Sequence, residues 1–221
     1  ERPDVWVHSH VSETAREVEW VASLFPGRAG YLDVYDHHGL LGARTVLAHG
    51  VHLTEPELAR CHATGTALAH CPTSNLFLGS GLFDLAAACD PARPVRVGLG
   101  TDVGAGTSFS LLRTLDEAGK VARLNGGRLD PAFGFYLATL GGARALGLDD
   151  RVGTFAEGYE ADVVVLDPRA TPLLALRTAG VEAIKDLLSA LFTLGDDRVV
   201  RATWVAGRLA HQRSQGGSGH G

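Results

Sequence analysis

Four short β-rich runs of this sequence each end in a side chain that can bind a metal ion or move a proton. They cover residues 5–10, 44–49, 66–70 and 96–102, and their last residues are His10, His49, His70 and Asp102. Successive members of this set are separated by about one strand–helix unit. Because the carboxyl ends of parallel strands in a barrel open onto one face, we expect the four side chains to converge. Imidazole and carboxylate ligands with an open position for water are typical of a hydrolytic zinc or iron site.

Each of these residues also has a purely structural interpretation. A single histidine at a strand end is more often hydrogen-bonded than metal-bound, and Asp102 could cap the turn at residues 104–106. Glu13 could be a solvated residue of a first helical turn, where the helix dipole favours a carboxylate. His8 shares a strand face with His10, and we interpret it as a supporting residue. Four such residues at successive strand ends are much less expected by chance than one.

The elements that must position these side chains alternate between strand and helix. Thr14 and Glu17 fit a capping box, which predicts a helix that follows the first strand and ends at Pro26–Gly27. Thr54 precedes another helix, with proline in its first turn. Repeated β-helix-β units predict an α/β protein with a parallel sheet, either doubly wound or part of a (β/α)8 barrel. Four histidines outside strand ends are expected on the surface or in loops: His37, His38, His52 and His62.

The chain divides into three predicted parts. Residues 1–150 form the α/β body, residues 151–212 a small β appendage with a returning helix, and residues 213–221 a flexible Gly/Ser tail. Within the appendage we expect strands over residues 153–155, 161–166 and 201–209, the last with a turn near Ala206–Gly207, and a helix over residues 180–194.

Composition excludes several classes of function. The chain has 221 residues, 45% of them hydrophobic, and a net charge of −5. Such a mildly acidic chain has no electrostatic footprint for nucleic acid or an anionic membrane. No apolar run approaches the ~20 residues of a membrane helix, and we expect no signal peptide. Three cysteines without metal-finger spacing, Cys61, Cys71 and Cys89, indicate a reducing compartment and a cytoplasmic protein, and we expect them to be small buried hydrophobes.

The strand-end runs resemble the amidohydrolase superfamily. The matching stretches are His10–Glu13, Ala48–Gly50, His70–Asn75 and Gly100–Asp102, followed by residues 138–143 and 157–162. Residues 75–83 and 194–198 are similar to the branch of the superfamily that deaminates guanine. The resemblance extends from about residue 5 to about residue 210. It implies the C-terminal half of a (β/α)8 metal-dependent hydrolase barrel, together with part of a small β-sandwich appendage.

The resemblance also implies a role for each candidate site residue. His10 and Asp102, at the ends of the fifth and eighth barrel strands, would bind one zinc ion, with iron as the alternative metal. Asp102 would also take a proton from the water that the metal holds. Glu13 would be the proton shuttle facing the purine ring, and His49 would orient the attacking hydroxide. His70 would support the site without binding the metal.

The activity implied is the hydrolytic deamination of guanine to xanthine and ammonia, a step of purine catabolism. Zinc lowers the pKa of bound water toward ~7 and so provides hydroxide at neutral pH. Glu13, as a carboxylic acid, can protonate a ring nitrogen, which makes the 2-carbon electrophilic. The implied partner is a free purine base, and the family resemblance also implies a homodimer.

The superfamily pattern is incomplete in this sequence. It requires a His-x-His pair at the end of the first barrel strand and an Arg-Phe pair for the guanine carbonyl, and His8 is the one histidine before His10. A catalytic zinc site normally has at least three protein ligands, whereas two are clear here. We therefore expect these residues to be the C-terminal half of a longer enzyme with a cut edge at Glu1. In isolation the chain would be inactive and weakly metallated.

Two alternatives stay open at this point. The protein could be another amidohydrolase acting on a different N-heterocycle, such as a triazine, a pterin or 8-oxoguanine. It could also be an inactive half-barrel fragment whose site residues are vestigial. A zinc deaminase of the cytidine type is disfavoured, because the sequence has no Pro-Cys-x-x-Cys run.

Overall fold

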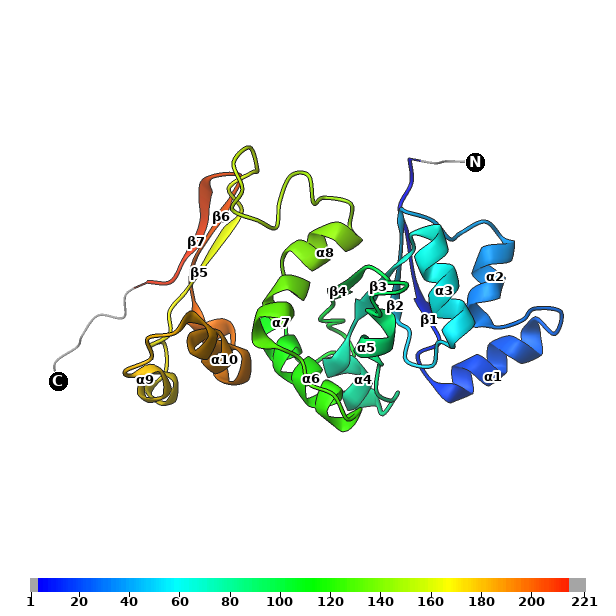
Figure 1. The fold of residues 1–221 in the computed structure, drawn as a ribbon, viewed down its shortest axis with the longest axis horizontal. Helices are drawn as coiled ribbons and strands as arrows, with labels where there is room; N and C mark the ends of the chain where they lie inside the picture. The colour runs from blue at the N-terminus through cyan, green and yellow to red at the C-terminus, as the bar shows by residue number, and fades with distance from the viewer. Residues whose placement is uncertain (1–3, 215–221) are drawn as a thin grey trace.

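The central sheet of the computed structural model, which describes residues 4–214, has four parallel strands paired in sequence order. Helices connect successive strands and cover the sheet (Figure 1), and this confirms the predicted α/β class. The strands are β1 (Val7–Val11), β2 (Thr45–His49), β3 (Ala67–His70) and β4 (Val97–Leu99). The helices of the body are α1 (Ala15–Leu24), α2 (Tyr31–His37), α3 (Glu55–Thr64), α4 (Pro72–Leu78), α5 (Leu85–Ala88), α6 (Leu111–Leu124), α7 (Pro131–Leu137) and α8 (Leu140–Ala145).

The sheet is buried between these helices. Every residue of β2 is buried, and Leu47 and Leu68 on neighbouring strands are at most 1% exposed. They belong to a core that includes Leu115 of α6 and Leu137 of α7. Such continuous apolar strands are expected in a parallel sheet, because helices cover both of its faces.

Strand ends differ slightly from the sequence prediction. β1 continues one residue beyond His10, and β4 stops at Leu99, so Asp102 lies in the following loop. β2 and β3 end at His49 and His70 as predicted. Among the described residues, no strand pairs with the outer edge of β1 or of β4.

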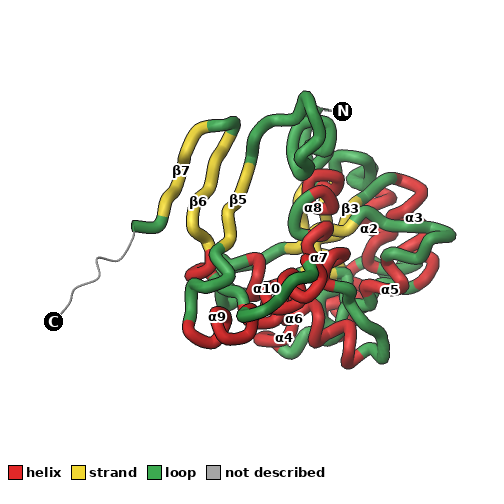
Figure 2. Tube along the Cα trace, turned by 60° about the vertical axis from the view of Figure 1, so that its left-hand side comes forward, coloured by secondary structure: helices red, strands yellow, loops and turns green. Residues whose placement is uncertain are grey.

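The C-terminal part is a three-stranded antiparallel sheet with two helices beside it. The strands β5 (Val163–Leu166), β6 (Val200–Val205) and β7 (Arg208–Gln212) stand apart from the parallel sheet (Figures 1 and 2). The helices α9 (Pro172–Thr178) and α10 (Ile184–Leu194) and a 3-10 turn (Asp197–Val199) lie between β5 and β6 in sequence. α10 packs against α6 and α7 of the body.

Two predictions for this part need correction, and a third is confirmed. Residues 153–155 form no strand, because Gly153, with a φ of 95°, packs against the backbone of Leu140 instead of pairing with a neighbour. The turn predicted near Ala206–Gly207 is confirmed: it joins β6 and β7 into a hairpin, and both turn residues have positive φ. The predicted helix 180–194 begins only at Ile184, and α9 was not predicted.

The exposure of the cysteines and of four histidines was also predicted from the sequence. Cys61 and Cys71 are buried, whereas Cys89 is partly exposed. The four histidines expected outside strand ends are all exposed, although His37 and His62 belong to helices. The predicted flexible tail lies outside the described residues from residue 215 onward. No helix in the described part of the chain is long and apolar enough to cross a membrane.

Candidate active site

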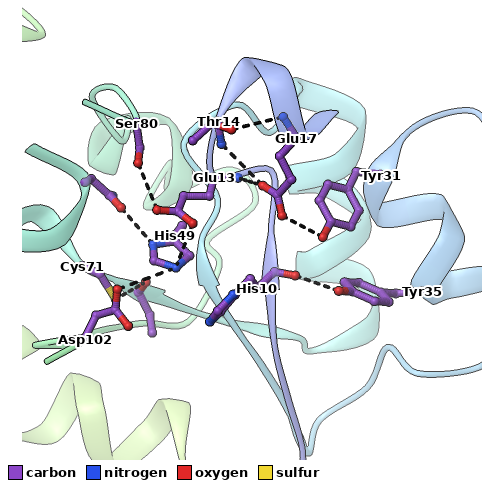
Figure 3. A network of polar contacts seen from close by, with 12 residues as sticks. His10, Glu13, Thr14, Glu17, Tyr31, Tyr35, His49, Cys71, Ser80 and Asp102 are labelled. Atoms are coloured by element: carbon purple, nitrogen blue, oxygen red, sulfur yellow. Dashed lines mark hydrogen bonds and ion pairs between the residues drawn. The ribbon is translucent and has the colours of Figure 1, made fainter. Parts of the chain in front are cut away.

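His10, His49 and Asp102 meet at the carboxyl edge of the parallel sheet. Within residues 4–214, their potential ligand atoms all lie within 4.8 Å of one another. The imidazole rings of His10 and His49 are 5.0 Å apart, centroid to centroid, in an edge-to-face arrangement. Glu13 joins this cluster, since its Oε2 lies 3.7 Å from His49 Nε2, and Asp102 Oδ2 lies 4.0 Å from the same nitrogen (Figure 3).

Left-handed backbone conformations bring these side chains together. His49 pairs with Val11 in the sheet, so a regular strand would direct its side chain to the face opposite His10. Instead His49 has a φ of 74°, which ends the strand alternation at this residue. Ser12 and Asp102 also have positive φ values, 46° and 49°. Non-glycine residues rarely adopt this conformation, and such strain is concentrated at functional sites.

Glu13 is held by the start of α1. Thr14 Oγ1 accepts a hydrogen bond from the backbone N–H of Glu17, and Glu17 Oε2 accepts from the N–H of Thr14, which confirms the predicted capping box. The same Glu17 oxygen accepts from the N–H of Glu13 at 2.7 Å. Glu17 Oε1 in turn accepts from the Tyr31 hydroxyl. The backbone that carries Glu13 is therefore fixed on the side away from the site.

His10 is anchored through its main chain. The Tyr35 hydroxyl donates to the carbonyl oxygen of His10 at 2.8 Å, while the His10 imidazole itself is exposed. His8 lies outside the cluster, and its Nδ1 is 3.1 Å from the carbonyl oxygen of Val46. This contact agrees with a supporting role for His8.

The four side chains differ in their access to solvent. The His49 side chain is 1% exposed, that of Glu13 17% and that of Asp102 30%. The site therefore has a buried imidazole at its base and two carboxylates reaching toward an open side. A cavity of about 490 Å³ lies elsewhere, between α6, α7 and α10, and none of the cluster residues lines it.

His70 and Cys71 follow β3 but do not join the cluster. The His70 imidazole is fully buried and stacks on Phe83, with ring centroids 4.7 Å apart. Burial lowers the pKa of His70 to about 3, which keeps it neutral. Burial, together with the nearby Asp102 carboxylate, raises the pKa of Cys71 to about 12, so this thiol is protonated at neutral pH.

Two polar residues near the cluster received no role from the sequence. Asn75 Oδ1 is 2.9 Å from His49 Nδ1, and the Ser80 hydroxyl donates to Glu13 Oε1 at 3.0 Å. Both residues lie in the run that resembles guanine-deaminating enzymes. However, no spacing rule connects them to partners 26 and 67 residues away.

The donor atoms of the cluster suit a metal ion. Two imidazoles and one carboxylate are the ligand types that zinc and other first-row transition ions accept, and the spread of 4.8 Å allows them to surround one ion. Asp102 is 30% exposed and the His10 side chain is exposed, so solvent reaches the cluster from this side. This His/Asp group could therefore hold a metal.

Residues 1–210 match the amidohydrolase family. The chain belongs to the amidohydrolase family. This amidohydrolase chain is 53% identical over 214 residues to the guanine deaminase of Escherichia coli K12, and the alignment covers 97% of this chain and 48% of that protein.

Solved structures agree with this assignment. The E. coli guanine deaminase structure superposes with a TM-score of 0.93 over 96% of this chain and 49% of that chain. A guanine deaminase from C. acetobutylicum with guanine bound in its active site is 30% identical, with a TM-score of 0.82 over 93% of this chain and 48% of that one. An adenosine deaminase from Xanthomonas campestris with bound zinc is 33% identical, with a TM-score of 0.82 over 93% and 45%.

The amidohydrolase resemblance drawn from the strand-end motifs is thus confirmed. The chain spans about half the length of the relatives it matches. The individual roles of His10, Glu13, His49 and Asp102 stay predictions, although the structure brings all four together.

Proposed function

We propose that the protein carrying this chain is a hydrolase that deaminates guanine to xanthine and ammonia. The observation that carries the proposal is the meeting of His10, His49 and Asp102 within 4.8 Å, with Glu13 beside them. The similarity to guanine deaminases over nearly the whole chain supports guanine as the substrate.

We further propose that residues 1–150 contribute four strands of a (β/α)8 barrel, and residues 151–212 part of its β appendage. The four parallel strands in sequence order support this arrangement, as do the described outer edges of β1 and β4, which have no partner strand. The length of the relatives also supports it, because this chain covers 48% of the E. coli guanine deaminase. In this arrangement, further metal ligands and purine contacts come from outside residues 4–214.

We propose zinc as the metal, one ion per site, with His10 and Asp102 as its ligands from this chain. The bound zinc in the adenosine deaminase relative supports zinc over iron. When bound, the ion would lower the pKa of a water molecule and stabilise negative charge on the reacting oxygen.

The residues of this chain then have separate tasks. Asp102 accepts the proton that the attacking water releases, and His49 orients that water from the buried base of the site. Glu13 delivers a proton to a ring nitrogen of guanine, so that the 2-carbon accepts the oxygen. The bond between the 2-carbon and the amino nitrogen then breaks, and the relay protonates the departing amine. One water is consumed, and xanthine and ammonia are the products.

The proposal is tested by measuring ammonia release with the full protein that carries this chain and bound zinc. Guanine should be turned over, whereas adenosine, a triazine, a pterin and 8-oxoguanine should not. Glu13→Gln should lower kcat by about 10²–10⁴-fold, because it removes the proton shuttle. The matched control is Glu19→Gln, which changes an exposed carboxylate of α1, the helix that follows Glu13.

Two outcomes would contradict the proposed deamination of guanine. Faster ammonia release from adenosine or another heterocycle would favour a different substrate for the same site. Adenosine is included in the panel because one similar structure is an adenosine deaminase. The absence of turnover on the whole panel, with zinc bound, would favour a vestigial site.

We also propose a homodimer, which the family resemblance supports, located in the cytoplasm, which the three free cysteines support. Light scattering of the purified protein should give twice the mass of one chain, and cell fractionation should recover the protein with soluble enzymes.

A further inference from the structure

One short segment contacts both His49 and Glu13, two of the candidate catalytic residues. This segment, residues 72–80, comprises α4 and the two residues after it. Asn75 reaches His49 Nδ1 with its Oδ1 at 2.9 Å. Ser80 donates to Glu13 Oε1 at 3.0 Å (Figure 3). No metal ligand assigned above is part of this segment.

The contact between Asn75 and His49 has a chemical consequence. Both residues are at most 1% exposed, so water does not compete for the bond. With the amide oxygen of Asn75 turned toward the ring, His49 Nδ1 carries the proton, because an amide oxygen can only accept. In the neutral ring, Nε2 then has a lone pair, and Nε2 is the nitrogen that faces Glu13 and Asp102.

The distances on the other side of the ring agree with this tautomer. His49 Nε2 lies 3.7 Å from Glu13 Oε2 and 4.0 Å from Asp102 Oδ2, and neither distance is a hydrogen bond. A proton on Nε2 would thus have no acceptor among these carboxylates. The proton on Nδ1, in contrast, is shared with Asn75 at 2.9 Å.

Ser80 holds the Glu13 carboxylate in place. Its hydroxyl occupies Glu13 Oε1, which leaves Oε2 as the oxygen turned toward His49. Ser80 is itself 4% exposed and held by its main chain, because its N–H donates to the carbonyl of Asn75 at 2.8 Å and its carbonyl lies 2.9 Å from His52 Nε2. The hydroxyl therefore has little freedom to leave the carboxylate.

We propose that Asn75 and Ser80 are positioning residues for the reaction at this site. Asn75 holds His49 in the tautomer with the proton on Nδ1, and Ser80 holds the Glu13 carboxylate with Oε2 free to exchange protons. The structural part of the inference stands on the contacts themselves, while its effect on turnover rests on the proposed function.

The test compares variants of the full protein that differ in one contact each. Asn75→Leu removes the acceptor, and Asn75→Asp keeps an oxygen acceptor at the same place. Ser80→Ala removes the hydroxyl bound to Glu13. The matched control is Ser74→Ala, the same chemical change in α4 at a residue that is 0% exposed and whose hydroxyl has no hydrogen-bond partner within the described residues.

The first measurement is the protonation of the His49 ring nitrogens by NMR of ¹⁵N-histidine-labelled protein without metal. The His49 signals are assigned by their loss in His49→Asn. We expect the proton on Nδ1 in the wild type and in Asn75→Asp, and a mixture of tautomers in Asn75→Leu. A wild-type proton found on Nε2 overturns the inference for Asn75.

The second measurement is the kinetics of ammonia release from guanine, with the zinc content of each variant. Asn75→Leu and Ser80→Ala should lower kcat by about 10–100-fold at a KM within about twofold, with zinc content unchanged. Asn75→Asp should recover most of the loss, and Ser74→Ala should match the wild type. An equal loss in Ser74→Ala and Ser80→Ala, or a loss proportional to missing zinc, contradicts the inference.

The two proposals fail separately. If the wild type releases no ammonia from guanine, the proposed function fails, while the His49 ring protonation in the wild type and in Asn75→Leu still decides the role of Asn75. Should Asn75→Leu fail to fold, Asn75→Asp and Ser80→Ala retain the comparison.

Discussion

Three histidines lie at or one residue before the ends of successive strands of the parallel sheet, yet their surroundings differ. The His10 imidazole is exposed, and that of His49 is buried against Asn75. The His70 imidazole is buried against Phe83, and neither of its ring nitrogens has a hydrogen-bond partner within the described residues. A buried imidazole without partners is stable only in its neutral form, and its pKa is accordingly lowered to about 3.

This environment predicts a pH dependence of stability. The unfolded chain takes up a proton at His70 below a pH of about 6.5, whereas the folded chain does so only near 3. Between these values the unfolded state binds more protons, so the free energy of unfolding falls by about 1.4 kcal/mol per pH unit of acidification. His70→Phe, which keeps a ring beside Phe83, should remove this slope. Denaturant unfolding of the metal-free protein at pH 5, 6 and 7.5 measures the difference, and equal slopes in both proteins would exclude His70 as the cause.

The sequence predicted which residues could take part in the chemistry, but it did not predict which side chains contact one another. Strand-end positions predicted that His10, His49, His70 and Asp102 converge, because parallel strands share a direction, and all but His70 do so. Asn75 and Ser80 could not be found in this way, since their contacts depend on how α4 packs beside two other strands. The exclusion of His70 from the cluster likewise follows from burial, which a strand-end pattern does not show.

Among the elements, the loop after β4 determines where Asp102 lies. Gly106 closes this loop, and its N–H donates to the carbonyl oxygen of Asp102 at 2.5 Å. A Cβ on Gly106 would lie 1.8 Å from the carbonyl oxygen of Thr101, so no other residue fits without moving the loop.

Gly106→Ala should therefore displace Asp102. We expect zinc affinity to fall by about tenfold or more and the stability to fall by about 1–3 kcal/mol, as for other overpacked sites. Gly42→Ala is the control, because a Cβ there meets no atom within 4 Å. Competition with a zinc chelator measures the affinity, and an unchanged value in Gly106→Ala would show that the loop does not set the position of Asp102.

The helix caps allow stability and activity to be separated. Thr14 and Glu17 cap α1 next to Glu13, and Thr54 and Glu57 form the corresponding box at the start of α3. Thr14→Ala and Thr54→Ala should each reduce the free energy of unfolding by about 1 kcal/mol. Only Thr14→Ala should also lower kcat, by severalfold, because it loosens the backbone that carries Glu13. Unfolding curves and steady-state kinetics on both variants check this, and equal activities would contradict it.

The same comparison shows which elements a sequence can predict. The capping box and the apolar strands β2 and β3 depend on local patterns, and these elements were predicted correctly. Residues 153–155 have the composition of a strand, but Gly153 docks on α8, and α9 depends on packing against α10. Such tertiary contacts decide short elements whose own preference is weak.

For the whole molecule, one aromatic side chain joins the C-terminal part to the body. The Phe192 ring of α10 lies against Gly119 of α6 and Gly134 of α7, where an added Cβ would lie 2.6 Å from the ring or from Leu115. Phe192 also belongs to the main core cluster, although it comes from the second part of the chain. The two parts therefore share a core.

Phe192→Ala should weaken this junction. We expect a loss of about 3–5 kcal/mol in the free energy of unfolding, because both glycines leave a cavity that cannot collapse. Limited proteolysis should then cut residues 163–212 faster. Phe155→Ala removes the same ring at a position that is 88% exposed and should change neither measurement. Equal proteolysis of both variants would mean that Phe192 does not hold the two parts together.

The left-handed backbone at His49 and Asp102 has a consequence for any population of variants selected only for thermal tolerance. Glycine adopts those φ values more readily than histidine or aspartate does. Such a selection would enrich glycine at residue 102, whose side chain is 30% exposed, and the survivors would retain the fold while losing this carboxylate. Residue 49 would stay histidine, because glycine there would leave a cavity and remove the ring that contacts Asn75. Screens for thermal tolerance of this protein should therefore hold residue 102 constant.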